Sequence, residues 1–384
     1  MLVMLSIFLS IFLSFYSQLH LSSGEHVTYK AQFLERLPLP ATGPESIAFD
    51  AAGGGPYTGI SDGRILKYVN GSVGFVEFAI TSSNSSEEFC VGNGSVALDF
   101  TCGRPFGLGF HYQTGDLYIA DAYYGLMVVG PNGGVATQLA NAADGVPFGF
   151  TNALDVDTET GMVYLVDYSS QFSVNEFSVS LQAHDMTGRL MKYDPESKEL
   201  TVLLGGLGGA AGMAISKDGS FILITETVTK RIRKFWLQGP KATTSEILKE
   251  FTVRPANIKR NEEGEFWVAF LVADETGSCP SQQQSPGLRI SGDGMILEAI
   301  SLDTQSGISE VAVYNGKMYI GSPFLHFVDV LHGLQSVTGE NEKEELMGRP
   351  NYGYLPDCGG MCCYLNKIVH TVLRSFEPQE KILP

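Results

Sequence analysis

Short apolar runs separated by polar turns containing glycine dominate the chain after residue 40. Runs such as LYIA, MVYLV and FILIT are rich in β-branched and aromatic side chains, which favours strands. The turns TGD, ETG and KDG join successive runs and are typical of hairpin connections. Sustained 3.6-residue periodicity is confined to the first residues and the far C-terminus, so the pattern predicts an all-β protein.

The same succession of apolar runs and turns recurs along the chain in six copies. They occupy residues 45–69, 105–130, 152–169 with 187–204, 211–237, 256–272 and 308–331. Each copy is interpreted as a four-stranded antiparallel unit, and such units at this spacing are typical of β-propeller blades. We therefore predict a six-bladed β-propeller. A pair of β-sandwiches is the alternative, and it explains the regular repeat poorly.

The segments flanking the repeats set the predicted domain limits. Residues 27–37, VTYKAQFLERL, precede the first copy and are predicted to complete the last blade, which closes the ring. The propeller is expected to span residues 24–332. Residues 333–384 are polar and rich in glycine and proline before one short helical stretch, so they are predicted to be an irregular or disordered tail. The tail cysteines Cys358, Cys362 and Cys363 have no histidine at zinc-ligand spacing.

Residues 1–23 contain no charged side chain, and the stretch from Leu2 to Tyr16 is nearly all apolar. This stretch is shorter than the ~20 residues that a membrane-spanning helix needs. Small residues follow at Ser22, Ser23 and Gly24. The pattern predicts a cleaved signal peptide, with an uncleaved anchor as the alternative, and no membrane span after cleavage.

Composition and charge narrow the classes of partner. The chain has 42 acidic and 25 basic residues and a net charge of −17, which argues against nucleic acid and anionic membranes as partners. Hydrophobic residues make up 44% of the chain, enough for a large core. A small-molecule ligand or substrate is the partner expected of such a protein.

A polar stretch between the first two copies contains three Asn-X-Ser sequons, which begin at Asn70, Asn84 and Asn93. Behind a signal peptide they predict a glycosylated surface. Cys90 and Cys102 flank the last sequon, and an oxidising compartment permits them to pair. Closing so short a loop would add about 3 kcal/mol in the chain-entropy model. Two free thiols are the alternative.

Several motifs resemble the plant strictosidine synthases and strictosidine synthase-like proteins. They are Cys102-Gly103-Arg104, LYIADAYYGL, GVPFGFTNALDVDTETGMVY, TGRLMKYDP, NIKRN and MYIG. The resemblance covers roughly residues 27–332. It implies a six-bladed propeller, a secretory-pathway destination in the vacuole or outside the cell, and a disulfide between Cys90 and Cys102. Strictosidine synthases of alkaloid biosynthesis condense tryptamine with secologanin in a Pictet–Spengler reaction, in which a pocket glutamate moves protons.

The chain departs from the synthases at the acid–base positions. Ser309 occupies the position of the catalytic glutamate, and Gly307 that of a neighbouring pocket histidine. Glu310 is one residue away, and adjacent strand residues point to opposite faces. We therefore expect the synthase reaction to be lost.

Part of the family's pocket lining is retained. The matching positions are Phe106, Phe150, Phe177 and Leu181, and His184 lies beside them in a segment, 169–187, that interrupts the third copy. This segment is predicted to cap the pocket. Ordinary core packing is the alternative role for the aromatic side chains.

A more distant resemblance is to the calcium-dependent propeller lactonases and arylesterases of the paraoxonase and gluconolactonase types. In those enzymes, oxygen ligands from several blades hold Ca²⁺, which polarises an ester carbonyl. Glu45, Asn152 and Asn257 each open a repeat, so equivalent places in different blades would put them around one axis. Ala211 and Ala256 stand where further ligands are expected, and the catalytic histidine expected near Phe106 is missing. A weak Ca²⁺ site is one hypothesis for these residues. The alternative is that Glu45, Asn152 and Asn257 satisfy backbone groups or waters in the channel.

Two functional hypotheses follow. As an enzyme, the protein would hydrolyse a small ester or lactone at this metal site. As a non-catalytic propeller, it would bind a small ligand or a partner at the same mouth of the channel.

Overall fold

The computed structural model describes residues 28–82, 89–91, 99–271, 285–302 and 307–337. The predicted signal peptide, the sequons at Asn84 and Asn93 and the cysteine-containing tail lie outside these ranges. Asn70 is described, and it is exposed at the turn between two strands of the first blade.

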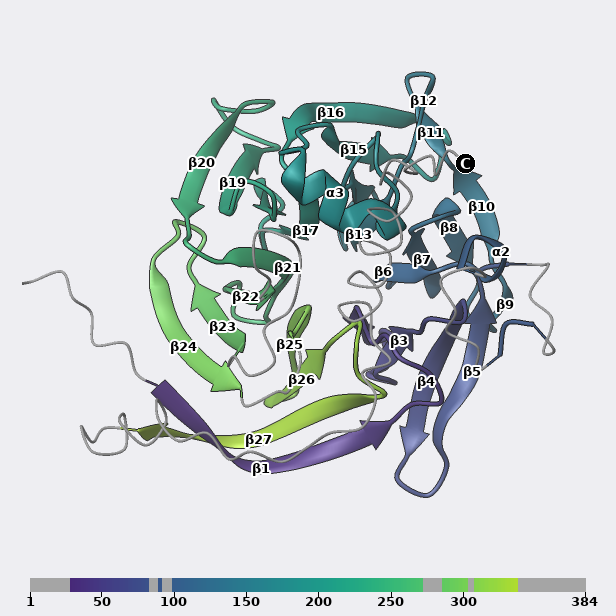
Figure 1. Cartoon of the computed structure of the whole chain (residues 1–384), viewed down its shortest axis with the longest axis vertical. Coiled ribbons are helices and arrows are strands. Elements are labelled where there is room, and N and C mark those ends of the chain that lie inside the picture. Colours follow the sequence, from purple (N-terminus) through teal and green to yellow (C-terminus); the bar gives the residue numbers. More distant parts are fainter. Residues whose placement is uncertain (1–27, 83–88, 92–98, 272–284, 303–306, 338–384) are drawn as a thin grey trace, which may run out of the picture.

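Six antiparallel sheets surround a common axis, which confirms the predicted propeller (Figure 1). From the axis outward, the first blade contains β2 (Ile47–Ala48), β3 (Tyr57–Gly59), β4 (Arg64–Asn70) and β5 (Gly74–Ile80). The second contains β6 (Pro105–His111), β7 (Asp116–Asp121), β8 (Gly125–Val129) and β10 (Thr137–Ala140). The third contains β13 (Thr151–Val156), β14 (Val163–Asp167), β15 (Gly188–Tyr193) and β16 (Leu200–Leu207).

The other three blades repeat this order. The fourth contains β17 (Ala210–Ile215), β18 (Phe221–Glu226), β19 (Arg231–Trp236) and β20 (Ser245–Glu250). The fifth contains β21 (Arg254–Arg260), β22 (Phe266–Leu271), β23 (Ser285–Ile290) and β24 (Ile296–Leu302). The sixth contains β25 (Glu310–Tyr314), β26 (Lys317–Gly321), β27 (Phe327–Val337) and β1 (Thr28–Pro38).

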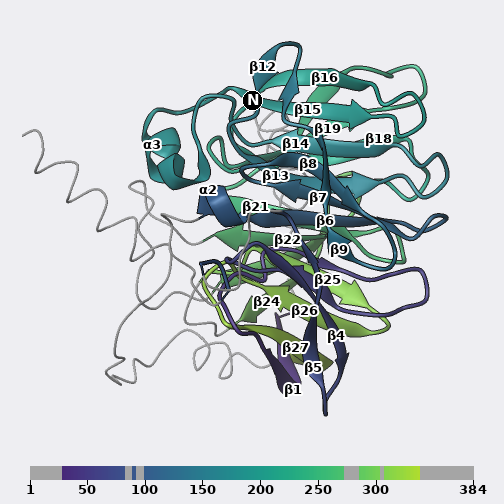
Figure 2. The same ribbon diagram turned by 90° about the vertical axis from the view of Figure 1, so that its right-hand side faces the viewer.

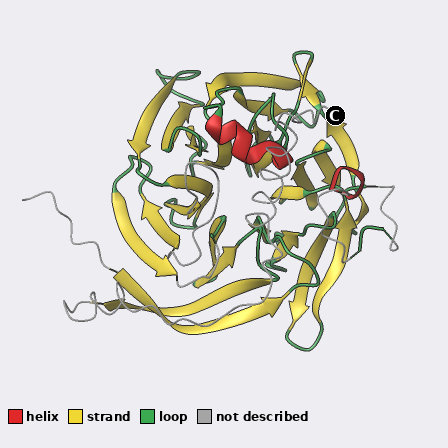
Figure 3. Cartoon of the chain, viewed as in Figure 1, coloured by secondary structure: helices red, strands yellow, loops and turns green. Residues whose placement is uncertain are grey.

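The remaining elements are short. They are β9 (Gly134–Val135), which pairs in parallel with β5, the hairpin β11 (Ala142–Ala143) and β12 (Val146–Pro147), α2 (Asp99–Cys102), the 3-10 helix η1 (Val174–Glu176) and α3 (Phe177–Gln182). Both α-helices lie on the same face of the propeller (Figures 2 and 3). Across the described ranges, no helix has the length and hydropathy to span a bilayer.

Strand β1 closes the ring, as the sequence predicts. It pairs antiparallel with β27 from Thr28 opposite Val337 to Pro38 opposite Phe327. Its first residues also pair in parallel with β24, so β1 joins the sixth blade to the fifth. The N-terminal and C-terminal strands of the propeller therefore lie side by side (Figure 1). Strand β27 continues to Val337, beyond the predicted boundary at residue 332.

The core consists of apolar layers between neighbouring blades. In β14, Val163 and Leu165 pack toward the second blade, whereas Tyr164 and Val166 pack toward the fourth. Both faces of the strand are buried, because each blade is covered on both sides. This arrangement explains why the strands have continuous apolar sequences rather than an alternating pattern.

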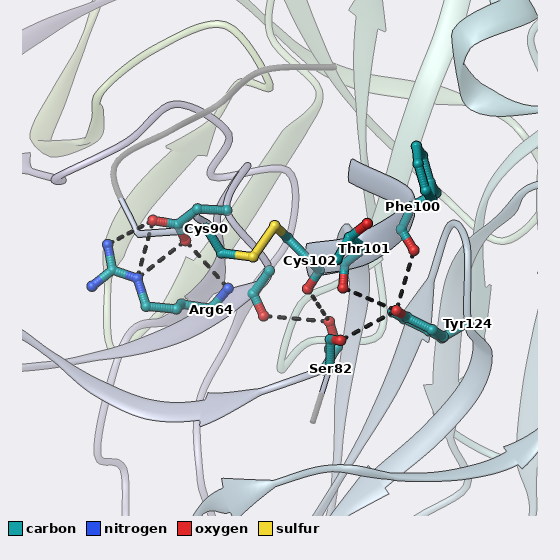
Figure 4. The surroundings of a disulfide bond; sticks show 10 residues. Arg64, Ser82, Cys90, Phe100, Thr101, Cys102 and Tyr124 are labelled. Carbon is teal, nitrogen blue, oxygen red and sulfur yellow. Dashed lines mark hydrogen bonds and ion pairs between the residues drawn. A yellow bond between two sulfur atoms is a disulfide. The ribbon is translucent and has the colours of Figure 1, made fainter. Parts of the chain in front are cut away.

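The disulfide between Cys90 and Cys102 is formed, as the resemblance implies (Figure 4). Both cysteines are buried. Around the bond, Tyr124 donates its hydroxyl to the carbonyls of Phe100 and Thr101 at 3.2 and 3.0 Å. Cys102 ends α2, two residues before Arg104, so the bridge fixes the chain just before it enters the second blade.

Replacing Cys90 and Cys102 together by serine is expected to lower the free energy of unfolding by about 3 kcal/mol, because the open loop gains conformational entropy in the unfolded state. Chemical denaturation of the oxidised protein and of the double variant measures the difference. The serine variant should be insensitive to a reductant that destabilises the wild type. Equal stability of the two proteins would contradict this structural role.

Candidate functional site

The innermost strands depart from regular pairing close to one end of the axis. In four of these strands the pairing register shifts, because one or two residues have no partner opposite them in the neighbouring strand. Such irregularities are typical of β-bulges, which change the direction of a side chain. The residues at these irregularities are Phe106 in β6, Asn152 in β13, Ala211 in β17, and Ala256 with Asn257 in β21. Two predicted metal ligands and one predicted pocket residue are therefore equivalent positions of different blades.

Glu45 lies just before β2 and contacts two other predicted site residues. Its backbone carbonyl accepts hydrogen bonds from the Asn257 amide nitrogen and from the Ser309 hydroxyl, both at 3.1 Å. The Ser309 carbonyl in turn accepts the Asn257 backbone N–H at 2.9 Å. All three residues are buried. The structure thus brings together Glu45, Asn257 and Ser309.

Asn152 joins this set through the fourth blade. Its amide nitrogen donates to the backbone carbonyl of Ala211. The next residue, Gly212, packs so closely on Asn257 that a Cβ there would lie 2.6 Å from the Asn257 Cα atom. Glycine at position 212 therefore permits the close approach of the fourth and fifth blades at the axis.

The hydrogen bonds fix the direction of both amides. The amide nitrogen of Asn152 donates to the Ala211 carbonyl, and that of Asn257 donates to the Glu45 carbonyl, each in another blade. The amide oxygen of each asparagine therefore remains available to another partner. Asn257 Oδ1 and Glu45 Oε2 are buried, and neither has a hydrogen-bond partner in the described parts of the chain. Buried acceptors are nearly always satisfied in native proteins, so this pair indicates a place for a cation, water or ligand.

Glu310, the neighbour of Ser309, approaches the same residues from the other side. It accepts the Ile47 backbone N–H at 2.6 Å and the Asn257 amide nitrogen at 3.4 Å, and Lys259 Nζ lies 3.7 Å from its carboxylate. Ser309 lies just before β25 and Glu310 begins it, and both side chains contact the site. Sequence reasoning missed the contributions of Glu310 and Lys259.

The electrostatics of the two carboxyls follow from their burial. Burial raises the pKa of Glu45 to about 7; the Arg104 guanidinium opposes this shift, and the Glu310 carboxylate adds to it. Burial also raises the pKa of Glu310, and the Lys259 ammonium opposes that shift. The site therefore pairs two buried carboxyls with two cationic side chains.

Aromatic side chains connect this end of the axis to helix α3. Phe106 packs on Phe150 with ring centroids 5.4 Å apart, Phe150 on Tyr168 at 5.1 Å, and Tyr168 on Phe177 at 5.6 Å. Phe177 begins α3, which lies on one face of the propeller near the axis (Figures 1 and 2). The predicted cap and three predicted pocket aromatics thus form one continuous cluster with Tyr168, which sequence reasoning missed.

The other two predicted pocket residues differ in their placement. Leu181 is buried in α3. His184 is exposed just after the helix, where its positive φ of 52° ends the helical turn and its Nδ1 lies 3.1 Å from the Leu181 carbonyl oxygen. The turn directs His184 back to its own helix, and the residue does not join the aromatic cluster.

The donor set at the axis fits a hard cation in chemical type. Calcium prefers carboxylate and amide oxygens, which Glu45, Asn152 and Asn257 supply. Two of these oxygens have no other partner among the described residues. Within the described ranges, no group of three or more His, Cys, Asp or Glu side chains could hold a metal ion. A cation at this site would therefore depend on the Glu45 carboxylate and on the amide oxygens of Asn152 and Asn257. Its other coordination positions would be left to water or substrate.

Comparisons with known proteins identify the family. Profiles of strictosidine synthase and of the N-terminal region of strictosidine synthase-like proteins match residues 152–240 and 32–68. Protein STRICTOSIDINE SYNTHASE-LIKE 10 of Arabidopsis thaliana is 43% identical over 325 residues, which cover 76% of this chain and 85% of that protein. The chain belongs to the strictosidine synthase family. Strictosidine synthase of Catharanthus roseus is another similar member, 38% identical over 297 residues, 76% of this chain and 84% of that protein.

Solved structures with a similar fold include two bacterial proteins. A gluconolactonase from Xanthomonas campestris has a TM-score of 0.56 at 13% identity and covers 82% of this chain and 96% of its own. The calcium-binding protein regucalcin from Agrobacterium tumefaciens has a TM-score of 0.55 at 13% identity, with 80% and 95% covered. At such identities the likeness is evidence for the fold alone.

Proposed function

We propose that this family member hydrolyses small esters or lactones at the axial site, with a divalent cation such as Ca²⁺ held by Glu45, Asn152 and Asn257. The observation that carries the proposal is the pair of buried oxygens, Glu45 Oε2 and Asn257 Oδ1, left without hydrogen-bond partners. When bound, the cation would polarise the ester carbonyl. The names of the similar gluconolactonase and regucalcin are consistent with such chemistry.

The chain's own residues would prepare the site for that reaction. The Glu45 carbonyl and the Ala211 carbonyl hold the two amides, so their oxygens need no reorientation when a ligand binds. The aromatic cluster from Phe106 to Phe177 would receive the apolar part of a substrate and exclude bulk water.

We further propose that the Pictet–Spengler reaction is lost in this chain. The hydroxyl of Ser309 donates to the Glu45 backbone carbonyl, and a serine hydroxyl is a much poorer proton acceptor than a carboxylate at the same position. A secretory-pathway location, in the vacuole or outside the cell, is part of the same proposal. The disulfide and the exposed sequon at Asn70 support it.

The test is turnover of 4-nitrophenyl acetate, phenyl acetate and δ-valerolactone by the purified full chain, in calcium and in chelator. We expect turnover that chelator abolishes and added calcium restores, and no product from tryptamine with secologanin. Turnover that chelator does not change would contradict the cation site. Calorimetric calcium binding without any turnover would favour the non-catalytic, ligand-binding propeller instead.

A further inference from the structure

Arg104 is buried but its guanidinium is unused. The side chain is 3% exposed, yet it donates no hydrogen bond and forms no ion pair to any residue in the described ranges. The other two arginines that are buried in those ranges are engaged. Arg189 bonds to Asp167 and to three backbone carbonyls, and Arg254 donates to the carbonyls of Thr227 and Val228. No side-chain nitrogen of Arg104 is fully shielded from solvent. Its five N–H donors are therefore held at a largely buried place but stay open to a ligand.

Packing holds the guanidinium in place without using its N–H groups. The ring of Phe106 lies on one side, with its centroid 5.1 Å from the guanidinium carbon. Gly43 lies against the terminal nitrogens, and a Cβ on it would come within 2.7 Å of Arg104 Nη2. The backbone is also fixed, because the Arg104 N–H donates to Asp121 at 2.8 Å. The guanidinium is therefore positioned in advance, with its donors free.

These donors lie at the axial site. Phe106 is a bulge residue equivalent to Asn152, and Gly43 lies two residues before Glu45. Arg104 is close enough to influence Glu45 electrostatically, but no nitrogen of its side chain comes within ion-pair distance of that carboxylate. The guanidinium donors and the unpartnered Glu45 oxygen are thus separate and close enough for one small ligand to reach both.

We propose that Arg104 binds the carboxylate of the substrate, so that the preferred substrates are small esters or lactones that carry a free carboxylate group. This inference rests on the proposed hydrolytic function. The planar fork of a guanidinium matches the two oxygens of a carboxylate. A dianion such as phosphate fits less well, because Glu45 and Glu310 add negative charge to the same site.

The test is calorimetric binding of benzoate, of its neutral isostere benzamide and of inorganic phosphate to the purified full chain. We expect the wild type to bind benzoate at least about 10-fold more tightly than benzamide or phosphate, because the hydrogen bonds of an ionised pair are the strong ones. Arg104→Gln should lose this preference. Arg104→Lys, which keeps the charge without the fork, should retain only part of it.

Two further variants distinguish the effect of the position of the Arg104 guanidinium from the effect of net charge on benzoate binding. Gly43→Ala keeps every charge but displaces the guanidinium and strains a backbone position with a φ of 104°, so it should weaken benzoate binding and also lower the melting temperature. Lys241→Gln removes one positive charge from an exposed ion pair with Glu246 and should bind benzoate like the wild type. Thermal melting establishes that each variant is folded.

Some results would overturn the proposal. They are equal benzoate affinity in the wild type and Arg104→Gln, equal affinity of the wild type for benzoate and benzamide, or phosphate binding as tight as benzoate binding. Specific benzoate binding in a protein that hydrolyses no ester would instead refute the proposed function and leave the carboxylate site standing. Ester turnover that does not favour carboxylate-bearing substrates would refute only the inference about Arg104.

Discussion

Glu45→Gln is expected to lower ester or lactone turnover at least about 100-fold without loss of the fold. Glu45 supplies the only carboxylate of the predicted cation site, and even the loss of an outer partner of a metal ligand typically costs 10- to 100-fold. In chelator, the variant should melt at the same temperature as the wild type or higher, because an ionised carboxyl buried at this position costs folding free energy. Initial-rate assays and thermal melts with and without calcium measure both effects.

The matched control is Glu246→Gln, which makes the same chemical change in an exposed ion pair with Lys241. It should leave turnover and the calcium-induced shift of the melting temperature unchanged. If Glu45→Gln retained wild-type turnover, the cation site would have to be abandoned.

Leu37→Asp is expected to be the most destabilising single change outside the site. Leu37 is 5% exposed in β1 and packs with Ile47 and Val328, between the first blade and the last. A charge placed there has no partner and also weakens ring closure, so a loss of more than about 4 kcal/mol in the free energy of unfolding is expected.

Denaturant unfolding followed by circular dichroism measures this loss. The control is Glu35→Gln, two residues earlier in the same strand, whose side chain is 42% exposed. It removes a partly exposed contact with His332 and should cost no more than about 1 kcal/mol. Similar stabilities of Leu37→Asp and the control would show that β1 contributes little to closing the ring.

The fold could be predicted from the sequence because its repeat is local. Each blade is a meander of neighbouring runs, and the unpaired run at residues 27–37 could only complete the last blade. The continuous apolar runs also predict that both faces of each sheet are buried, as they are in β14 and β18. Parallel pairing of β1 with β24 could not be predicted, because it depends on how far two strands extend past the blade edge.

The candidate site was predictable only in part. Glu45, Asn152 and Asn257 each open a repeat, and the structure puts Glu45 in contact with Asn257 while Asn152 contacts Ala211 of the fourth blade. Their amide orientations depend on carbonyls of other blades, which no local pattern specifies. Arg104 lies within a motif that the sequence singles out, but whether an arginine is buried and unpaired depends on contacts with residues far away in sequence, such as Gly43.

During synthesis, β1 leaves the ribosome long before its partner strand exists. The ion-paired residues Arg36 and Asp329 are 293 positions apart in the chain. At about 5–20 residues per second, translation of the intervening chain takes roughly 15–60 s. Throughout this time β1 presents an unpaired strand edge, which promotes association with other nascent chains. The strand that closes the finished ring is therefore the segment most in need of a chaperone while the protein is being made.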